Sequence, residues 1–215
     1  ENEVVATYAA QKMSMTSSPI FWLATSVVFG VYLTTLYPSV AGGDSGELIA
    51  ESCHLGTAHP PGYPLFTLVS WGFTQMLGPL LGGTPAWRSN LLGAMFDTIS
   101  AACVFLCVEE WLRPGPSQLV RFAAPAFARI AGAVAAMGLF ALSPLIWMYA
   151  SHAEVFAMNN ALIGCIVFLS IRFGRTKSPR VAELGAFMCG LALTNQHTAI
   201  LYEGECYFYF MIEYD

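Results

Sequence analysis

The sequence predicts an all-α polytopic membrane protein with about five transmembrane helices and further helices at the lumenal membrane surface. Three observations support this prediction. Hydrophobic residues make up 56% of the 215 residues and charged residues only 11%, whereas soluble domains carry about 25% charged residues. Apolar runs near the ~20 residues needed to cross a bilayer recur along the chain. Lys and Arg gather in two of the intervening loops, a pattern typical of membrane proteins.

The first predicted span follows a weakly charged polar leader at residues 1–18. Residues 20–37 carry no charged side chain, and Pro19 and Pro38 stand on either side of the run. The run lacks the small-residue cleavage site of a secretory signal peptide, so we interpret it as an uncleaved anchor. Four further runs, each ended by an arginine, a proline or a polar cluster, are predicted to span the membrane. They cover residues 91–112, 130–149, 158–173 and 184–201.

The run at residues 63–80 is less apolar, because Thr67, Ser70 and Gln75 dilute it. Its aromatic residues suit a position at the level of the lipid headgroups. The positive-inside rule places loops rich in Lys and Arg on the cytosolic side. A sixth crossing at residues 63–80 would move both basic loops outside, so we predict a helix on the outer surface. The basic loops contain Arg113, Arg121 and Arg129, and Arg172, Arg175, Lys177 and Arg180.

This topology brings several separated polar segments to the outer face of the membrane. The segments 39–64 and 151–156 contain no Lys or Arg, which places them in the lumen or outside the cell. Titratable groups that converge in a concave site typically mark an active or binding site, although outer loops collect polar residues in any membrane protein. The catalytic candidates are Asp44 and Glu47, and the substrate-binding candidates are His59, Tyr63, Arg88, His152, Glu154, Asn195, Gln196 and His197.

The acids Asp44 and Glu47 support two interpretations. An acid followed three residues later by a glutamate is typical of a capping box, which satisfies free amides at a helix start. Alternatively, the preceding Gly42-Gly43 pair lets the backbone turn sharply or approach a ligand closely. A carboxylate held there could act as a general base. If the helix begins at Ser45, Glu47 and Glu51 lie four residues apart on one face of it.

The other polar motifs have alternatives of the same kind. Prolines after His59 would hold its side chain on a stiff segment, although proline is also common in a first helical turn. His152 and Glu154 alternate in an extended segment before the next helix. The stretch at residues 195–197 lies within an apolar run, where amides and imidazoles are costly unless they have partners. Asp97 lies within a predicted span and is either functional or paired with another helix.

Several classes of function lack support in the sequence. The sequence contains no His-Glu-x-x-His zinc motif, no Ser-His-Asp or Cys-His arrangement and no glycine-rich phosphate loop. Nothing in it suggests nucleic-acid binding. The six cysteines show no metal-ligand spacing and lie mostly in apolar runs, so we expect buried thiols. We predict neither a metal site nor a bound cofactor.

One base and several hydrogen-bond donors fit direct group transfer better. In such a reaction an acceptor hydroxyl loses its proton to a carboxylate while it attacks an activated carbon, and we assign the base role to Asp44. A lipid-linked donor would explain why the chemistry lies at a membrane. Its phosphate leaving group would need cationic or amide partners, for which Arg88, His59 and His197 are candidates.

Four motifs resemble one known family. They are GGDSGEL at residues 42–48, AHPPGYPLFTL at residues 58–68, AEVF at residues 153–156 and NQHT at residues 195–198. The chain resembles the eukaryotic polytopic protein O-mannosyltransferases that modify immunoglobulin-like plexin domains in the endoplasmic reticulum, together with their bacterial relatives. The resemblance covers about residues 37–202, the amino-terminal half of a catalytic module. We therefore divide the chain into the leader 1–18, a membrane glycosyltransferase-like domain 19–202 and a divergent tail 203–215.

The resemblance implies part of the C-type membrane glycosyltransferase fold in the endoplasmic reticulum, with its active face in the lumen. It implies transfer of mannose from a dolichol-phosphate donor to Ser or Thr of an acceptor protein, without a cofactor. It implies that Asp44, with Glu47 beside it, is the acid of the first lumenal loop. It places residues 59–63 beside the lipid phosphate, and Glu154 and His197 on the sugar side.

The sequence leaves open two alternatives to a glycosyltransferase. The first is a catalytically inactive, truncated relative that serves as a structural accessory subunit of a larger membrane complex. The second is a transporter, which is disfavoured because the polar groups gather at one face instead of midway through the bilayer.

Overall fold

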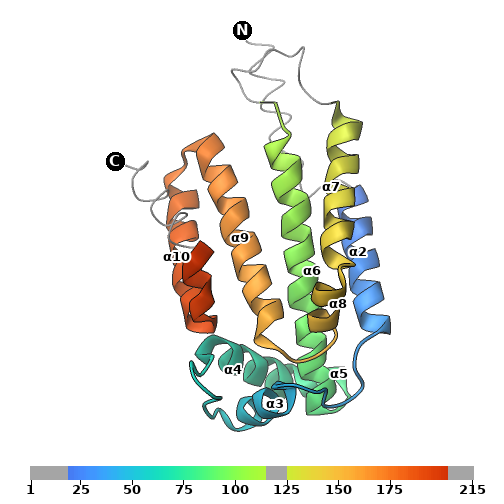
Figure 1. Ribbon diagram of the computed structural model, residues 1–215, viewed down its shortest axis with the longest axis vertical. Helices are drawn as coiled ribbons and strands as arrows, with labels where there is room; N and C mark the ends of the chain where they lie inside the picture. The colour runs from blue at the N-terminus through green and yellow to red at the C-terminus, as the bar shows by residue number, and fades with distance from the viewer. Residues whose placement is uncertain (1–18, 115–124, 203–215) are drawn as a thin grey trace.

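The computed structural model describes residues 19–114 and 125–202, and these residues form helices joined by loops (Figure 1). The all-α prediction is therefore confirmed. Proline opens many of the helices, because its missing amide and fixed φ suit the first helical position. In chain order the helices are α2 (Pro19–Thr34), α3 (Ser45–His54), α4 (Pro64–Trp71), a π-helix (Gly72–Leu77), α5 (Gly78–Leu81), α6 (Pro85–Trp111), α7 (Ala126–Ala141), α8 (Pro144–Ala150), α9 (Val155–Thr176), α10 (Pro179–Asn195) and a 3-10 turn (His197–Ala199).

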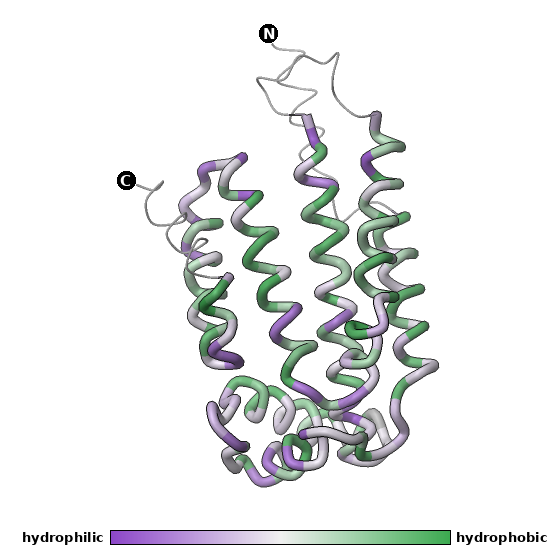
Figure 2. The backbone as a smooth tube through the Cα atoms, in the orientation of Figure 1, coloured by the Kyte–Doolittle hydropathy of each residue, from purple (hydrophilic) through white to green (hydrophobic). Residues whose placement is uncertain are grey.

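The long helices form a bundle with α6 at its centre. Helix α6 packs against α2, α7, α8 and α9, and α9 packs against α10 on its other side. Successive bundle segments run in alternating directions, down α2, up α6, down α7 and α8, up α9 and down α10 (Figure 1). Figure 2 shows hydrophobic residues along the bundle and hydrophilic residues concentrated at its ends. The predicted apolar segments therefore form successive members of this bundle.

The described helices support fewer membrane spans than the five predicted. Two helices, α6 and α9, are long and apolar enough to cross a membrane, and a third candidate arises if α7 and α8 form one bent span. Helix α2 has 16 residues and α10 has 17. At 1.5 Å per residue these helices are about 24 and 26 Å long, shorter than the ~30 Å hydrocarbon core. The described helices therefore give two or three candidate spans instead of the five predicted.

Two of the predicted spans are interrupted. The segment 130–149 bends by 70° between α7 and α8, because Pro144 starts a new helix and cannot donate a hydrogen bond to the preceding turn. The segment 184–201 breaks at Gln196, which takes an extended conformation with φ −151° and ψ 128° between α10 and the 3-10 turn that follows. Both breaks occur beside small or polar residues that hydropathy alone does not distinguish from a continuous run.

A second layer of short helices lies across the lower end of the bundle in Figure 1. Helix α3 begins at Ser45, directly after the N-cap residue Asp44. The run 63–80, predicted as one helix, is helical without a gap from Pro64 to Leu81, with a π-helical stretch between α4 and α5. Buried apolar side chains join this layer to the bundle, because Leu48 and Phe66 share a core with Met158 and Cys189. Helices α3 and α4 therefore share an apolar core with α9 and α10.

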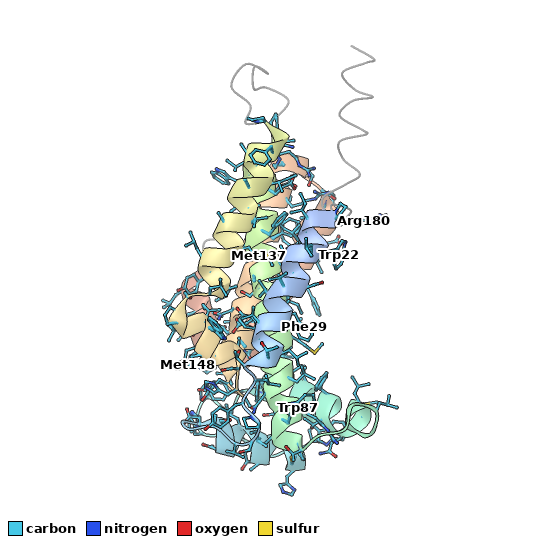
Figure 3. The ribbon with its side chains drawn as sticks, turned by 90° about the vertical axis from the view of Figure 1, so that its right-hand side faces the viewer. Trp22, Phe29, Trp87, Met137, Met148 and Arg180 are labelled. Atoms are coloured by element: carbon cyan, nitrogen blue, oxygen red, sulfur yellow. The ribbon has the colours of Figure 1, made fainter. Side chains whose placement is uncertain are left out.

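The basic residues lie at the opposite end of the bundle. Glu110, which is buried near the end of α6, accepts hydrogen bonds or ion pairs from Arg172 at 3.2 Å and Arg175 at 3.1 Å, both near the end of α9. Figure 3 shows Arg180 near the upper end and Met148 and Trp87 toward the lower end. The predicted separation of basic loops from polar motifs is therefore present within the described residues, while Arg121 lies outside them.

Within the bundle, Asp97 is fully buried and accepts a hydrogen bond from Asn160 at 3.1 Å. This contact fits the prediction that Asp97 pairs with another helix, here α9. The cysteines of the described residues are free thiols, and Cys103 and Cys165 lie 3.6 Å apart between α6 and α9. The predicted burial holds for Cys103 and Cys189, whereas Cys53, Cys107 and Cys165 are partly exposed. Cys206 lies outside the described residues.

Candidate functional site

A cleft of about 600 Å³ opens at the lower end of the bundle. Its walls come from the loop between α2 and α3 and from the segment that joins α8 to α9. Three of the predicted site residues, Asp44, His152 and Glu154, share this cleft although 110 positions separate the first from the last in sequence. The cleft is lined by Tyr37, Ala41, Gly42, Gly43, Asp44, Met148, Tyr149, Ser151, His152, Glu154 and Phe156.

Asp44 stands at the N-cap position of α3, but its side chain makes no capping hydrogen bond. The capping-box interpretation is therefore wrong for this residue, and its side chain is 60% exposed. The preceding Gly43 has φ +71°, and a Cβ at that position would lie 3.2 Å from Oε1 of Glu154. Glycine thus suits both the left-handed conformation and the close approach of the Glu154 side chain to the backbone at residue 43. The Asp44 carboxylate remains available to a ligand.

Glu47, His59 and Tyr63 form a cluster beside Asp44. Oε1 of Glu47 accepts a hydrogen bond from the backbone amide of His59 at 2.6 Å, and Oε2 lies 3.1 Å from Nδ1 of the same residue. Nε2 of His59 lies 3.4 Å from the Tyr63 hydroxyl and 3.7 Å from Oδ2 of Asp44. The rings of His59 and Tyr63 meet edge to face at 5.4 Å. The cluster therefore joins the loop before α4 to the first turn of α3.

The charges in this cluster shift two pKa values in opposite directions. Hydrogen bonds from the His59 amide and imidazole hold the pKa of Glu47 below its usual value. Partial burial, reinforced by the charges of Asp44, Glu154 and Glu47, raises the pKa of Tyr63. Tyr63 also has φ +45°, a left-handed conformation that is unusual for a bulky residue. Strained residues of this kind cluster at functional sites, where the surrounding structure holds them in place.

Glu154 and His152 form the more buried wall of the cleft. Glu154 is only 6% exposed, and burial together with the nearby Asp44 charge raises the pKa of its carboxyl group, an effect that the Asp44 backbone amide and His59 partly offset. Burial lowers the pKa of His152. The ring of Tyr149 lies 5.8 Å from that of His152 and 4.5 Å from that of Phe156. This wall offers hydrogen bonding beside aromatic faces.

Arg88 is not brought to the cleft. Its guanidinium group donates three hydrogen bonds to the carbonyl groups of Thr74, Gly82 and Gly83, at 3.0, 2.8 and 3.0 Å. These contacts tie the π-helix and the turn after α5 to the first turn of α6. In this arrangement Arg88 holds the surface layer in place, and a role in binding the substrate stays a prediction.

The polar stretch after α10 lies at the same end of the bundle as the cleft but does not line it. Asn195 donates a hydrogen bond to the Val155 carbonyl group at 3.3 Å. Among the described residues, the side-chain oxygens of Asn195 and Gln196 are buried without a hydrogen-bond partner. His197 is exposed at the start of the 3-10 turn. These residues share a face with Asp44, and their roles in binding remain predictions.

Asn90, to which no sequence motif pointed, holds the two walls of the cleft together. Asn90 is completely buried in α6. Its Nδ2 donates to the carbonyl groups of Tyr37 and Ser39, both at 2.8 Å, and its Oδ1 accepts from the Ala153 amide at 2.8 Å. The Asn90 side-chain amide stands at the edge of an apolar run, where burial without hydrogen-bond partners is costly. This cost is the sequence feature that could have indicated a structural role for Asn90.

The chemistry available here is proton transfer and recognition of hydroxyl groups. An exposed carboxylate and a buried carboxyl group lie within one cleft, with an imidazole and a phenol beside them. Within residues 19–114 and 125–202, no group of three or more His, Cys, Asp or Glu side chains is arranged to hold a metal ion.

Comparisons with known proteins identify relatives over most of the chain. Residues 44–214 match the family described as the protein O-mannosyl-transferase TMEM260 N-terminal domain. The mouse protein O-mannosyl-transferase TMEM260 is 41% identical over 179 residues, which are 81% of this chain and 23% of the mouse protein. The Dictyostelium discoideum protein of the same name is 35% identical over 184 residues, covering 80% of this chain and 20% of the relative. The chain thus spans less than a quarter of the length of these curated relatives. No solved structure gives a match.

Proposed function

This chain belongs to the TMEM260 protein O-mannosyl-transferase family, and from that premise we propose that it carries the acid-bearing part of a membrane mannosyltransferase active site. The donor is mannose linked to dolichol phosphate, and the acceptor is a Ser or Thr hydroxyl of a protein in the lumen of the endoplasmic reticulum. The observation that supports this proposal best is the exposed Asp44 carboxylate, which faces a cleft shared with Glu154 and makes no capping bond.

The proposed reaction is a single displacement. Asp44 takes the proton of the acceptor hydroxyl, and the hydroxyl oxygen forms a bond to the anomeric carbon of mannose. The bond from that carbon to the phosphate oxygen breaks, and the phosphate leaves with the bonding electron pair. Attack on the side opposite the leaving group inverts the anomeric carbon, so no covalent sugar–enzyme intermediate forms.

The buried wall of the cleft is suited to the sugar. A carboxyl group with a raised pKa, as in Glu154, can both donate and accept hydrogen bonds with sugar hydroxyls. Tyr149 and Phe156 offer aromatic faces against the apolar side of a sugar ring. His197 and the amides at residues 195–196 lie at the same end of the bundle, where the lipid phosphate would enter from the membrane.

The test is mannose transfer from dolichyl-phosphate mannose to an immunoglobulin-like plexin domain, measured with the full protein in microsomes. Asp44→Asn should reduce turnover by about 10²- to 10⁴-fold, the usual contribution of a general base, without changing membrane insertion. Glu51→Gln, which removes an acid about two turns beyond Asp44 on α3, serves as the matched control and should retain activity. Full activity of Asp44→Asn would remove Asp44 from the mechanism. No transfer by the wild-type protein would favour the accessory-subunit alternative.

A further inference from the structure

The contacts of His59 define which of its ring nitrogens carries a proton. Glu47 accepts hydrogen bonds from both the backbone amide and the Nδ1 group of His59, at 2.6 and 3.1 Å. An ionised carboxylate can only accept hydrogen bonds, so the Nδ1 atom must be the donor. These same two bonds hold the pKa of Glu47 low and keep it ionised. In a neutral imidazole the Nε2 atom is then left as the acceptor.

The Nε2 atom faces a hydroxyl donor and a carboxylate. The Tyr63 hydroxyl, at 3.4 Å, can donate to the Nε2 lone pair. Oδ2 of Asp44 lies 3.7 Å away, and neither it nor the unprotonated Nε2 atom has a proton to share. The titratable groups that face the ring are Asp44 and Glu47 from α3, Tyr63 from the N-terminus of α4 and, at longer range, Glu154 before α9. Protonation of Asp44 would supply the proton for a hydrogen bond between its Oδ2 atom and Nε2 of His59.

We propose that Glu47 is a positioning residue that fixes His59 in the Nδ1–H tautomer, so that Nε2 receives the proton that Asp44 removes from the acceptor hydroxyl. This inference rests on the proposed function of Asp44. In this relay Glu47 does not contact the reacting atoms, since it acts only through His59. It also gives His59 a role in proton transfer instead of phosphate binding.

The proton balance of this relay is complete without a further reactant. After the acceptor oxygen has bonded to the sugar, its proton resides on Asp44 and the phosphate has left with the bonding pair. The proton passes from Oδ2 to Nε2, which regenerates the Asp44 carboxylate and leaves an imidazolium paired with Glu47. Side chains of His59 and Asp44 are 36% and 60% exposed, so water can accept the proton from Nε2 and restore the neutral ring.

The first measurement is the tautomer of His59 in the full protein, labelled with ¹⁵N-histidine and reconstituted in lipid nanodiscs. The chain has four histidines, and His59→Gln identifies the signal. At about pH 8, where an ordinary imidazole is neutral, the wild type should show a protonated Nδ1 and an unprotonated Nε2. Glu47→Gln leaves one acceptor oxygen for two donors, the His59 backbone amide and Nδ1, so it should populate the Nδ1–H form less than the wild type and more than Glu47→Ala. Glu47→Ala should populate the Nε2–H form, and the control Glu51→Ala should not.

The second measurement is turnover with dolichyl-phosphate mannose. Glu47→Ala should lower kcat about tenfold, a part of the 10²- to 10⁴-fold effect of the base itself, with KM for the donor unchanged. Glu47→Gln, which keeps one of the two acceptor oxygens, should recover part of that loss. An Nδ1–H tautomer that persists in Glu47→Ala, or a tautomer change that leaves kcat unaltered, would overturn the relay. The tautomer measurement does not need activity, so a failure of Asp44 as the base is recognised separately by an active Asp44→Asn variant.

Discussion

Replacing Asn90 with alanine should open the cleft and destabilise the protein. The variant loses three hydrogen bonds of 2.8 Å, which join α6 to the backbone at Tyr37, Ser39 and Ala153. A typical intramolecular hydrogen bond contributes about 1 kcal/mol net, so three of them amount to about 3 kcal/mol. The cost rises further because a buried carbonyl or amide group left without a partner is penalised. A loss of at least about 3 kcal/mol in the free energy of unfolding is therefore expected.

The assay is chemical unfolding in detergent micelles, with mannose transfer measured on the same preparations. Asn159→Ala is a suitable control, because Asn159 is also buried but its side-chain oxygen has no hydrogen-bond partner among the described residues. The control should lose clearly less stability than Asn90→Ala. If Asn90→Ala stays within about 0.5 kcal/mol of the wild type, as an ordinary surface substitution does, then Asn90 does not hold the cleft walls together.

Three other predictions concern the same walls. Gly43→Ala should lose about 1–2 kcal/mol, because its left-handed φ is costly for other residues and its Cβ would crowd Glu154; Gly42→Ala, which has open space and no positive φ, should lose much less in thermal unfolding. Gly93→Ala should reduce transfer by displacing the His152 segment, since the new Cβ would lie 3.0 Å from the carbonyl oxygen of His152; unchanged donor KM and kcat would contradict this. The raised pKa of Glu154 means that its contribution to stability is full below its ordinary value of 4.5 and is lost as pH rises through the higher folded value; Glu154→Gln should remove that loss when unfolding free energies are compared across pH, and an identical pH dependence would refute it.

The sequence predicted the helical class and the order of the bundle segments. These features depend on local composition, since an apolar run of the right length forms a helix wherever its side chains meet lipid or other apolar groups. Hydropathy could not reveal the 70° bend at Pro144 or the early end of α10 at Asn195. At both positions one or two residues decide the backbone path while the average hydropathy stays high.

The site was predicted with less accuracy than the helices. Asp44, His152 and Glu154 share the cleft as expected, because the predicted topology already placed them on one face. Arg88 was a candidate for binding the substrate, but its donors are directed to backbone carbonyl groups. Asn90 was overlooked, because its hydrogen-bond partners lie 51 to 63 positions away in sequence and no local pattern predicts them.

The sequence by itself determined that the chain is helical, that much of it suits a lipid environment and that its acidic and basic motifs belong to opposite ends. Those properties follow from the free energy of transferring each side chain out of water, which is fixed by residue type and spacing. Only the tertiary structure decided that Asp44 leaves its cap unformed, that Glu47 turns to His59 and that Asn90 joins both walls of the cleft. Hydrogen bonds depend on distance and direction between groups far apart in the chain, and packing of the helices sets both.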